Sequence, residues 1–582
     1  MSDIKETFPS AEEPEELAEP VSAEDGIEKT EPESRSVARS AGIISIAVMF
    51  SRVFGLVREM VFSRLFGAGF LIDSFNVGFR IPNLLRDLFA EGALSAAFVK
   101  VFTDYQVTKG EKEAWRLASL VFNLLAIVLS LITIIGILLA PYYVPLIASG
   151  FEPEKAALAV TLTQIMFPFI LLVALAAVAM GILNTKGRFG IPASASTAFN
   201  IVSILTGIAL AYYLSGGGWS ISEDKNAVPE LPAQWAIIGM AFGTLAGGAA
   251  QLLIQVPSLF KVGFRFRPAV SFRDEGVRRV MRLMGPAVIG TSAVQIKVLV
   301  DTFVVSGIDG GNSWLPYSFR LMQFPIGLFG VALGTAAIPT LARLASENNI
   351  QKFRSTLSNT LTLVFLMTIP SACGLIVLSE PIIRLLYEGG RFTATDTDMT
   401  AWALAAYSVG LAAYSAIKVL SPSFYALDDA RTPMYVSLAS ILVHAPSSYG
   451  LMLLFSQIGV SDARPNGYGH VGVALATSIV ALVNFAALTF LMRRKIKRLE
   501  GRSIFASFVK IVAASLLMSV AAYATYYVLT NYFAGKNLLV KMIEAFVPIA
   551  AGGLTFLIAA KILGVKELNQ AIDAVMRKFK RK

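Results

Sequence analysis

The sequence predicts an all-α integral membrane protein with about fourteen transmembrane helices, arranged as two six-helix lobes followed by two C-terminal helices. Three observations support this prediction: the hydrophobic content, the recurrence of bilayer-length apolar runs, and an internal repeat. Of the 582 residues, 55% are hydrophobic and only 15% are charged, whereas soluble globular domains carry about 25% charged residues. Lipid is therefore the expected solvent for most of the chain.

Apolar stretches of about 20 residues, long enough to cross a hydrocarbon core of about 30 Å, recur along the sequence. The first, second, eighth and tenth contain ionisable residues, which weakens their hydropathy signal. The predicted spans are 40–66, 74–99, 117–140, 157–184, 192–215, 235–259, 283–306, 314–341, 356–379, 400–425, 433–456, 470–492, 506–530 and 539–562.

Lysine and arginine are concentrated in alternate loops, and this bias predicts the orientation of the chain. The loops and tail on one side hold 30 basic residues, including those of 260–282 and 561–582, against seven on the other side. Basic loops are retained in the cytoplasm, so both termini are expected there, as an even number of spans requires. Topology thus accounts for the basic excess, and nucleic-acid binding is not expected.

An internal repeat with an offset of about 240 residues divides the spans into two lobes. Phe79-Arg80 matches Phe319-Arg320, and two further dipeptides match at the same offset. Six spans separate the equivalents, so the two copies share one orientation and are related by a pseudo-two-fold axis along the membrane normal. Transporters built in this way bind their substrate at the interface between the repeats.

The composition of the two termini completes the predicted organisation. The first 35 residues hold 12 acidic residues, three basic residues and four prolines, which is typical of a disordered segment and unlike a signal peptide. The predicted parts are an acidic, disordered cytoplasmic tail (1–38), an N-lobe (39–260), a basic cytoplasmic loop (261–282), a C-lobe (283–492), two added helices (493–562) and a basic cytoplasmic tail (563–582).

Few residues of the chain are suited to catalysis or metal binding. Cys373 is the single cysteine, so no intramolecular disulfide can form, and His444 and His470 lie far apart in sequence without cysteine partners. We therefore expect no metal site and no cofactor. The longest predicted outer loop, near 216–234, contains no catalytic constellation, which argues against an enzyme.

The unusual feature is a group of charged residues inside the predicted spans. Each charge near the bilayer centre costs about 2.5–3.5 kcal/mol unless it is paired or hydrated. Such residues either pair with one another at the lobe interface or face a wet cavity. Arginine binds phosphate through a planar, bidentate fork, so several intramembrane arginines indicate an anionic substrate such as a pyrophosphate. The residues are Arg52, Arg58 and Glu59 in the first span, Arg80, Arg86, Asp87 and Glu91 in the second, and Arg320 in the eighth.

Four sequence blocks stand out: SRVFGLVRE, DSFNVGFRIPNLLRDLFAEGALSAAFV, RLMQFPIGLFGVALGTAAIPTL and KVLSPSFYALDDARTP. They resemble the MurJ/MviN family of lipid II flippases, which belongs to the multidrug/oligosaccharidyl-lipid/polysaccharide exporter superfamily. The resemblance extends over residues 40–562, and the block in the second span is highly specific.

The resemblance implies a central cavity between the lobes and a groove for a lipid tail along the last two helices. It implies a multi-pass protein of the bacterial inner membrane that moves lipid II, the undecaprenyl-pyrophosphate-linked peptidoglycan precursor, to the outer leaflet by alternating access. Membrane lipids and cell-wall synthesis proteins are the further partners it implies. Arg80 stands where a lysine is frequent in the family. The substrate-binding residues expected from the family are Ser51, Arg52, Arg58, Arg80, Asn83, Arg86, Glu91 and Arg320.

A coupling cation such as sodium is a further implication of the resemblance. In some relatives the cation site uses an acid in the seventh span and Asn or Asp in the eleventh. Asp301 is the candidate for the first ligand, but the eleventh span offers His444 and Ser448 instead. The sequence therefore leaves the use of a cation open.

Other functions are kept as alternatives. A flippase for another polyprenyl-linked oligosaccharide would share every feature above. A cation-coupled drug exporter of the same superfamily would favour acidic and aromatic residues over a cluster of arginines. A membrane enzyme acting on polyprenyl-linked sugars would place acidic or histidine residues in large extramembrane loops, and a structural scaffold would have no need of intramembrane arginines.

Overall fold

The computed structural model describes residues 33–89, 93–217, 231–462, 464–498, 501–533, 535, 537–565 and 567–568. Within these ranges the chain is helical, and the only β structure is a pair of isolated bridges. A helix satisfies its own backbone hydrogen bonds, which hydrocarbon cannot do. The predicted all-α fold is confirmed for this part of the chain.

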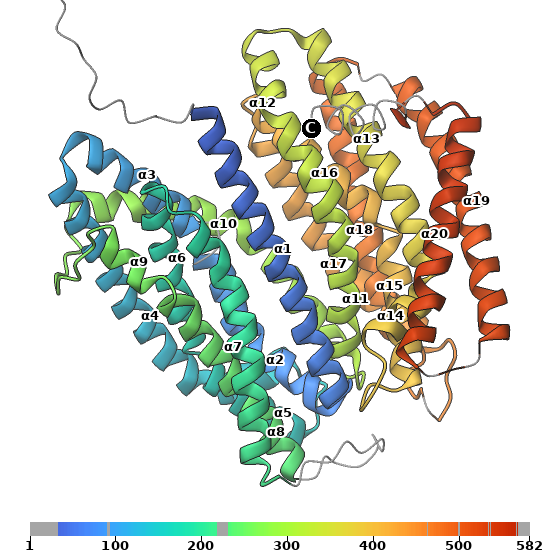
Figure 1. The fold of residues 1–582 in the computed structure, drawn as a ribbon, viewed down its shortest axis with the longest axis horizontal. Helices are drawn as coiled ribbons and strands as arrows, with labels where there is room; N and C mark the ends of the chain where they lie inside the picture. The colour runs from blue at the N-terminus through green and yellow to red at the C-terminus, as the bar shows by residue number, and fades with distance from the viewer. Residues whose placement is uncertain are drawn as a thin grey trace, which may run out of the picture.

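The N-lobe forms the left-hand half of Figure 1, and α1 runs between it and the other lobe. Its two broken spans are α5 with α6, interrupted near Pro168, and α8 with α9. The helices are α1 (Glu33–Phe66), α2 (Phe70–Phe89), α3 (Ala93–Thr108), α4 (Glu111–Ile147), α5 (Pro153–Met166), α6 (Phe169–Thr185), α7 (Gly190–Leu214), α8 (Leu231–Leu253) and α9 (Val256–Lys261).

The C-lobe and the two added helices form the right-hand half of Figure 1. A π-helical turn, η1 (Ile326–Val331), lies within its second span, between α11 and α12. The helices are α10 (Glu275–Val304), α11 (Gly311–Pro325), α12 (Ala332–Ser346), α13 (Ile350–Val377), α14 (Ser379–Leu386), α15 (Ala394–Ser408), α16 (Leu411–Tyr425), α17 (Arg431–Ser456), α18 (Gly469–Lys495), α19 (Gly501–Tyr532) and α20 (Leu538–Ile562).

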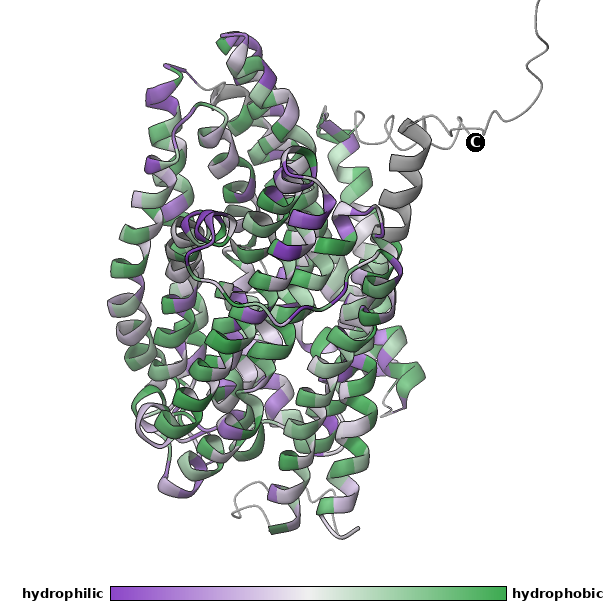
Figure 2. Cartoon of the chain, turned by 90° about the vertical axis from the view of Figure 1, so that its left-hand side faces the viewer, coloured by the Kyte–Doolittle hydropathy of each residue, from purple (hydrophilic) through white to green (hydrophobic). Residues whose placement is uncertain are grey.

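Ten helical segments of the described chain are long and apolar enough to span a membrane, and the bent pair α15 and α16, which meet at 43°, would make eleven. The other three predicted spans coincide with α1, with α2 and α3, and with α10, whose charged residues lower their hydropathy. A total of fourteen therefore remains a prediction. Figure 2 shows hydrophobic residues along the outside of the helices, where lipid is expected.

Two predicted boundaries differ from the structure. Helix α10 begins at Glu275, inside the predicted loop 261–282, because the Asp274 carboxylate caps its first turn by accepting hydrogen bonds from Gly276 and Val277. Helix α1 begins at Glu33, inside the predicted tail 1–38. Most of that tail, and residues 569–582 of the basic C-terminal tail, lie outside the described residues.

The two lobes share an extensive hydrophobic core at one end of the bundle. Phe62, Phe66 and Phe75 of the N-lobe pack in one buried cluster with Trp314 and Tyr387 of the C-lobe. Toward the opposite end the described residues form two further clusters, one around α13 and α19 and one around α3 and α4, and the second also includes Val277 and Val280 of α10. The shared end is the one at which α1 finishes and α2 begins, which the predicted topology places outside the cell.

Candidate functional site

Helix α1 presents two charged side chains to the C-lobe. The Glu59 carboxylate forms an ion pair with Arg320 of α11 and accepts a hydrogen bond from the Tyr387 hydroxyl at 3.4 Å. Two helical turns before Glu59, the Arg52 guanidinium lies against Gly327 of η1. A Cβ added to Gly327 would lie 2.8 Å from Nη1 of Arg52. π-Helical turns are frequent at functional sites, and this one leaves room for the arginine.

Arg58 lies on another face of α1 and points to the N-lobe. Its guanidinium carbon stands 5.0 Å from the ring centroid of Phe199 on α7. Among the described residues it has no ion pair or hydrogen bond, although it lies within the electrostatic reach of Glu59, Arg320 and Arg86. Arginines from both lobes therefore surround a single carboxylate, which leaves positive charge available for an anion.

The predicted residues of α2 have different surroundings. Arg80 faces the C-lobe within electrostatic reach of Asp301, and its buried Nε has no hydrogen-bond partner in the described chain. Arg86 pairs with Asp87 at 2.7 Å, and Asp87 accepts a hydrogen bond from Gln295 of α10 at 3.0 Å. Arg86 thus fits the interpretation that intramembrane charges pair with one another at the lobe interface, and Arg80 fits it less well.

The remaining predicted residues are positioned as follows. Ser51 is half-buried, and its carbonyl oxygen accepts a hydrogen bond from the Asn200 side chain at 3.3 Å. Asn83 is half-buried on α2. Glu91 lies outside the described residues. Arg80 and Arg320, which are equivalent in the internal repeat, have different partners, because Arg320 is paired with Glu59 and Arg80 lies near Asp301.

The surroundings of Asp301 test the predicted cation ligand. Its Oδ1 lies 2.6 Å from His444 Nε2 and 3.4 Å from the Ser448 hydroxyl, and its Oδ2 lies 3.4 Å from Lys297 Nζ. Hard cations bind several oxygen ligands, whereas this carboxylate already faces an ammonium group and an imidazole. The residues therefore do not fit a sodium site. In the described ranges no cluster of three or more His, Cys, Asp or Glu residues could hold a metal.

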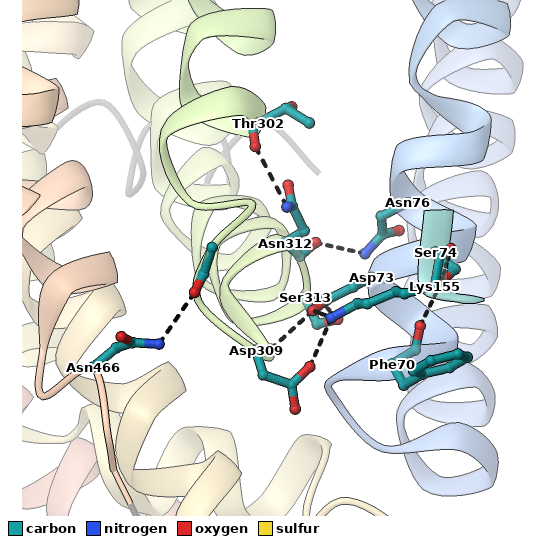
Figure 3. Close-up of polar contacts among 12 residues, drawn as sticks. Phe70, Asp73, Ser74, Asn76, Lys155, Thr302, Asp309, Asn312, Ser313 and Asn466 are labelled. Carbon is teal, nitrogen blue, oxygen red and sulfur yellow. Dashed lines mark hydrogen bonds and ion pairs between the residues drawn. The ribbon is translucent and has the colours of Figure 1, made fainter. Parts of the chain in front are cut away.

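A second polar cluster joins the lobes at the end where they share a core, and we call it the outer gate: Asp73, Lys155, Asp309, Gly310 and Ser313 (Figure 3). Lys155 Nζ lies 2.8 Å from Asp73 Oδ2 and 2.7 Å from Asp309 Oδ1. Asp73, which is 0% exposed, also accepts hydrogen bonds from the Gly310 amide at 2.8 Å and the Ser313 hydroxyl at 2.5 Å. The N-lobe is thereby fastened to the α10–α11 turn of the C-lobe.

The outer gate lies at the axis of the internal repeat. Asp73 and Ser313 are 240 residues apart, which is the offset of the repeat, and they bind each other. Equivalent residues can meet in this way only near the pseudo-two-fold axis. The gate was not predicted from the sequence, although the repeat offset applied to Asp73 points to Ser313. The pairing of Lys155 with both acids had no sequence signal.

Two helical lobes that meet at one end, with arginines between them and lipid-length apolar helices around them, define a multi-pass membrane transporter. A family model described as lipid II flippase MurJ matches residues 62–543. The chain belongs to the lipid II flippase MurJ family. This membership confirms the prediction of a transporter rather than an enzyme.

Individual relatives agree with the family match. The chain is 32% identical to a probable lipid II flippase MurJ of Buchnera aphidicola, over 90% of this chain and 97% of the relative. It is 34% identical to a lipid II flippase MurJ of Burkholderia cenocepacia, over 82% of this chain and 87% of the relative.

Two solved structures share the fold. A lipid II flippase MurJ in an inward closed conformation matches with a TM-score of 0.68 and 28% identity, covering 89% of this chain and 98% of that one. An inward-facing multidrug resistance transporter of the MATE family matches with a TM-score of 0.61 and 13% identity, over 78% of this chain and 98% of that one. The second match concerns the fold alone.

Proposed function

We propose that this protein moves lipid II from the inner to the outer leaflet of the bacterial inner membrane by alternating access. The observation that carries the proposal is the set of arginines between the lobes in a chain of the lipid II flippase MurJ family. Both termini would then be cytoplasmic, and cell-wall synthesis proteins would use the delivered lipid.

In this proposal the pyrophosphate binds between Arg58 and Arg320, with Arg52 and Arg80 extending the positive surface. Charge-assisted hydrogen bonds from guanidinium groups to phosphate are among the strongest polar contacts in proteins. Glu59 holds Arg320 until the phosphate competes for it, so binding would loosen one link between α1 and the C-lobe. A ligand shifts a conformational equilibrium only through such a difference in affinity between two states.

The outer gate supplies the second part of the proposed cycle. With its ion pairs intact the lobes are joined on the outside, so substrate would enter from the cytoplasmic side. Release would require Lys155 to separate from Asp309, and Asp73 from Gly310 and Ser313. The lipid tail would remain in the membrane along α19 and α20 throughout.

Depletion of the protein in its native host tests the function. Lipid II should accumulate in the cell while the amount exposed on the outer leaflet falls, and cells should lose their shape and lyse. Normal outer-leaflet lipid II in depleted cells that lack a second flippase would refute the proposal.

A further inference from the structure

The segment between α9 and α10 combines exposed arginines with exposed aromatic residues, and we call residues 262–274 the basic strap. It forms the green loop at the left-hand edge of Figure 1, next to α9. In Figure 2, where this side faces the viewer, a loop with both hydrophilic and hydrophobic residues crosses the outside of the helices. The strap therefore lies along the side of the N-lobe rather than above the central site.

The backbone of the strap is fixed to the lobe. The Asn123 side chain on α4 donates hydrogen bonds to the carbonyl oxygens of Arg267 at 2.7 Å and Ala269 at 3.0 Å. Phe264 is buried and packs against Trp115 and Phe122, with ring centroids 6.0 and 6.3 Å away. The strap is thus a built surface with a defined set of outward-facing side chains.

Those outward-facing side chains alternate between two kinds. Phe266, Val270 and Phe272 are each more than half exposed, and Arg265, Arg267 and Arg273 are exposed beside them. In the described chain these three arginines have no ion pair. The neighbouring acids are engaged elsewhere.

Three contacts show where those acids are engaged. Asp274 caps α10, Glu275 pairs with Lys109, and Asp104 pairs with Arg279. These three acids are therefore not available as partners for the arginines of the strap.

We propose that the basic strap is a binding site for anionic phospholipid headgroups of the cytoplasmic leaflet. Aromatic and aliphatic side chains are favoured at the level of the headgroups, where arginines reach phosphate while their stems lie against apolar groups. Anionic lipids on the cytoplasmic face attract basic segments close to the membrane. If the strap faced only water, the exposed side chains of Phe266 and Phe272 would have no apolar group to pack against. The proposal depends on the predicted orientation and not on the transported substrate.

Lipid binding to the purified full-length protein tests the site. Phosphatidylglycerol or phosphatidylcholine is added to the protein in detergent, and bound lipids are counted by native mass spectrometry. Each basic residue near an anionic surface changes the affinity roughly fivefold. The triple variant Arg265→Gln, Arg267→Gln, Arg273→Gln should therefore bind phosphatidylglycerol on the order of a hundredfold more weakly, with little change for phosphatidylcholine.

Three further variants make the result specific. The control is the triple variant Arg343→Gln, Lys352→Gln, Lys497→Gln, at exposed positions outside the strap. It removes the same charge as the strap variant. Its affinity for phosphatidylglycerol should stay within about fivefold of wild type, which is the effect of one basic residue near an anionic surface. Replacing the three strap arginines by lysine should retain most of the binding. Phe266→Ser with Phe272→Ser should weaken it without altering charge. Wild-type phosphatidylglycerol binding in the strap glutamine variant, or an equal loss in both glutamine triples, would overturn the proposal.

Discussion

The outer gate and the central arginines hold their charges in opposite ways. In the gate, Lys155 is placed between two carboxylates, and the buried Asp73 receives hydrogen bonds from Gly310 and Ser313 as well. Between the lobes, Arg58 has no ion pair among the described residues, and the Nε of Arg80 has no partner. In the gate every charged group has a partner within the protein, whereas the described part of the central site holds more arginines than carboxylates to pair with them.

The difference shows how one interface between the lobes can both join the lobes at one end and offer a binding site for an anion. A buried charge pair stabilises the state in which the pair exists, because breaking it leaves a buried charge uncompensated, so the gate favours the state in which the lobes are joined at this end. An incompletely paired arginine within the membrane is energetically unfavourable, and in the proposed function an anionic substrate would relieve that cost. Variants that remove one partner from each region should therefore have different effects.

The largest effect on stability is expected in the gate. Lys155→Met leaves the fully buried Asp73 carboxylate without its counter-ion, which should lower the free energy of unfolding by about 3–5 kcal/mol. Asp309→Asn removes the other, 70% exposed carboxylate and should cost less than about 1 kcal/mol. Thermal unfolding of the purified variants measures both. Equal losses in the two variants would show that the gate does not depend on a buried pair.

The central arginines should affect binding more than stability. Arg58→Ala and Arg320→Ala each remove charge-assisted hydrogen bonds worth about 1.5–3 kcal/mol, so lipid II should bind about 10–100-fold more weakly. Arg58→Lys should retain part of the affinity, since a lysine keeps the charge without the fork. Arg343→Ala, at an exposed position away from the lobe interface, is the control. Binding by surface plasmon resonance to protein in nanodiscs gives the comparison, and wild-type affinity in both arginine variants would contradict it.

The smallest effect is expected for sodium. Asp301 already faces Lys297 and His444, so replacing sodium by potassium should leave transport unchanged. The measurement is the rate of lipid II movement in vesicles at constant ionic strength. A sodium requirement that disappears in the Asp301→Asn variant would show that this carboxylate binds the ion and would reverse our interpretation of the site.

Much of the fold could be predicted because its causes are local. Bilayer-length apolar runs determine where helices form, and the offset between Phe79-Arg80 and Phe319-Arg320 indicates the two lobes. Helix α10 begins at Glu275, before the predicted span 283–306, because Asp274 caps its first turn, and hydropathy alone does not predict such a cap. Proline marks the break between α5 and α6, at Pro168, whereas no proline lies at the break between α15 and α16, which the sequence therefore did not predict.

The sequence indicated which residues form the candidate site, but it did not indicate which of them form ion pairs with one another. Arg52 and Glu59 are seven residues apart, a spacing that puts both on one face of a helix, and both meet the C-lobe in the structure. The sequence could not show that Glu59 would pair with Arg320, because that contact depends on how the lobes are docked. The same limit applies to Lys155, because its contact with Asp309 of the other lobe also depends on how the lobes are docked.

The most direct test of the central claim is lipid II movement in reconstituted vesicles. Lipid II placed in both leaflets of proteoliposomes is converted by an enzyme added outside, and the fraction that reacts reports transfer across the bilayer. Wild-type protein should make nearly all of the lipid II reactive, whereas Arg58→Ala, Arg320→Ala protein should leave the protected half unchanged. Equal transfer by wild-type and double-variant protein, or by empty vesicles, would contradict the account that these arginines carry the pyrophosphate through the membrane.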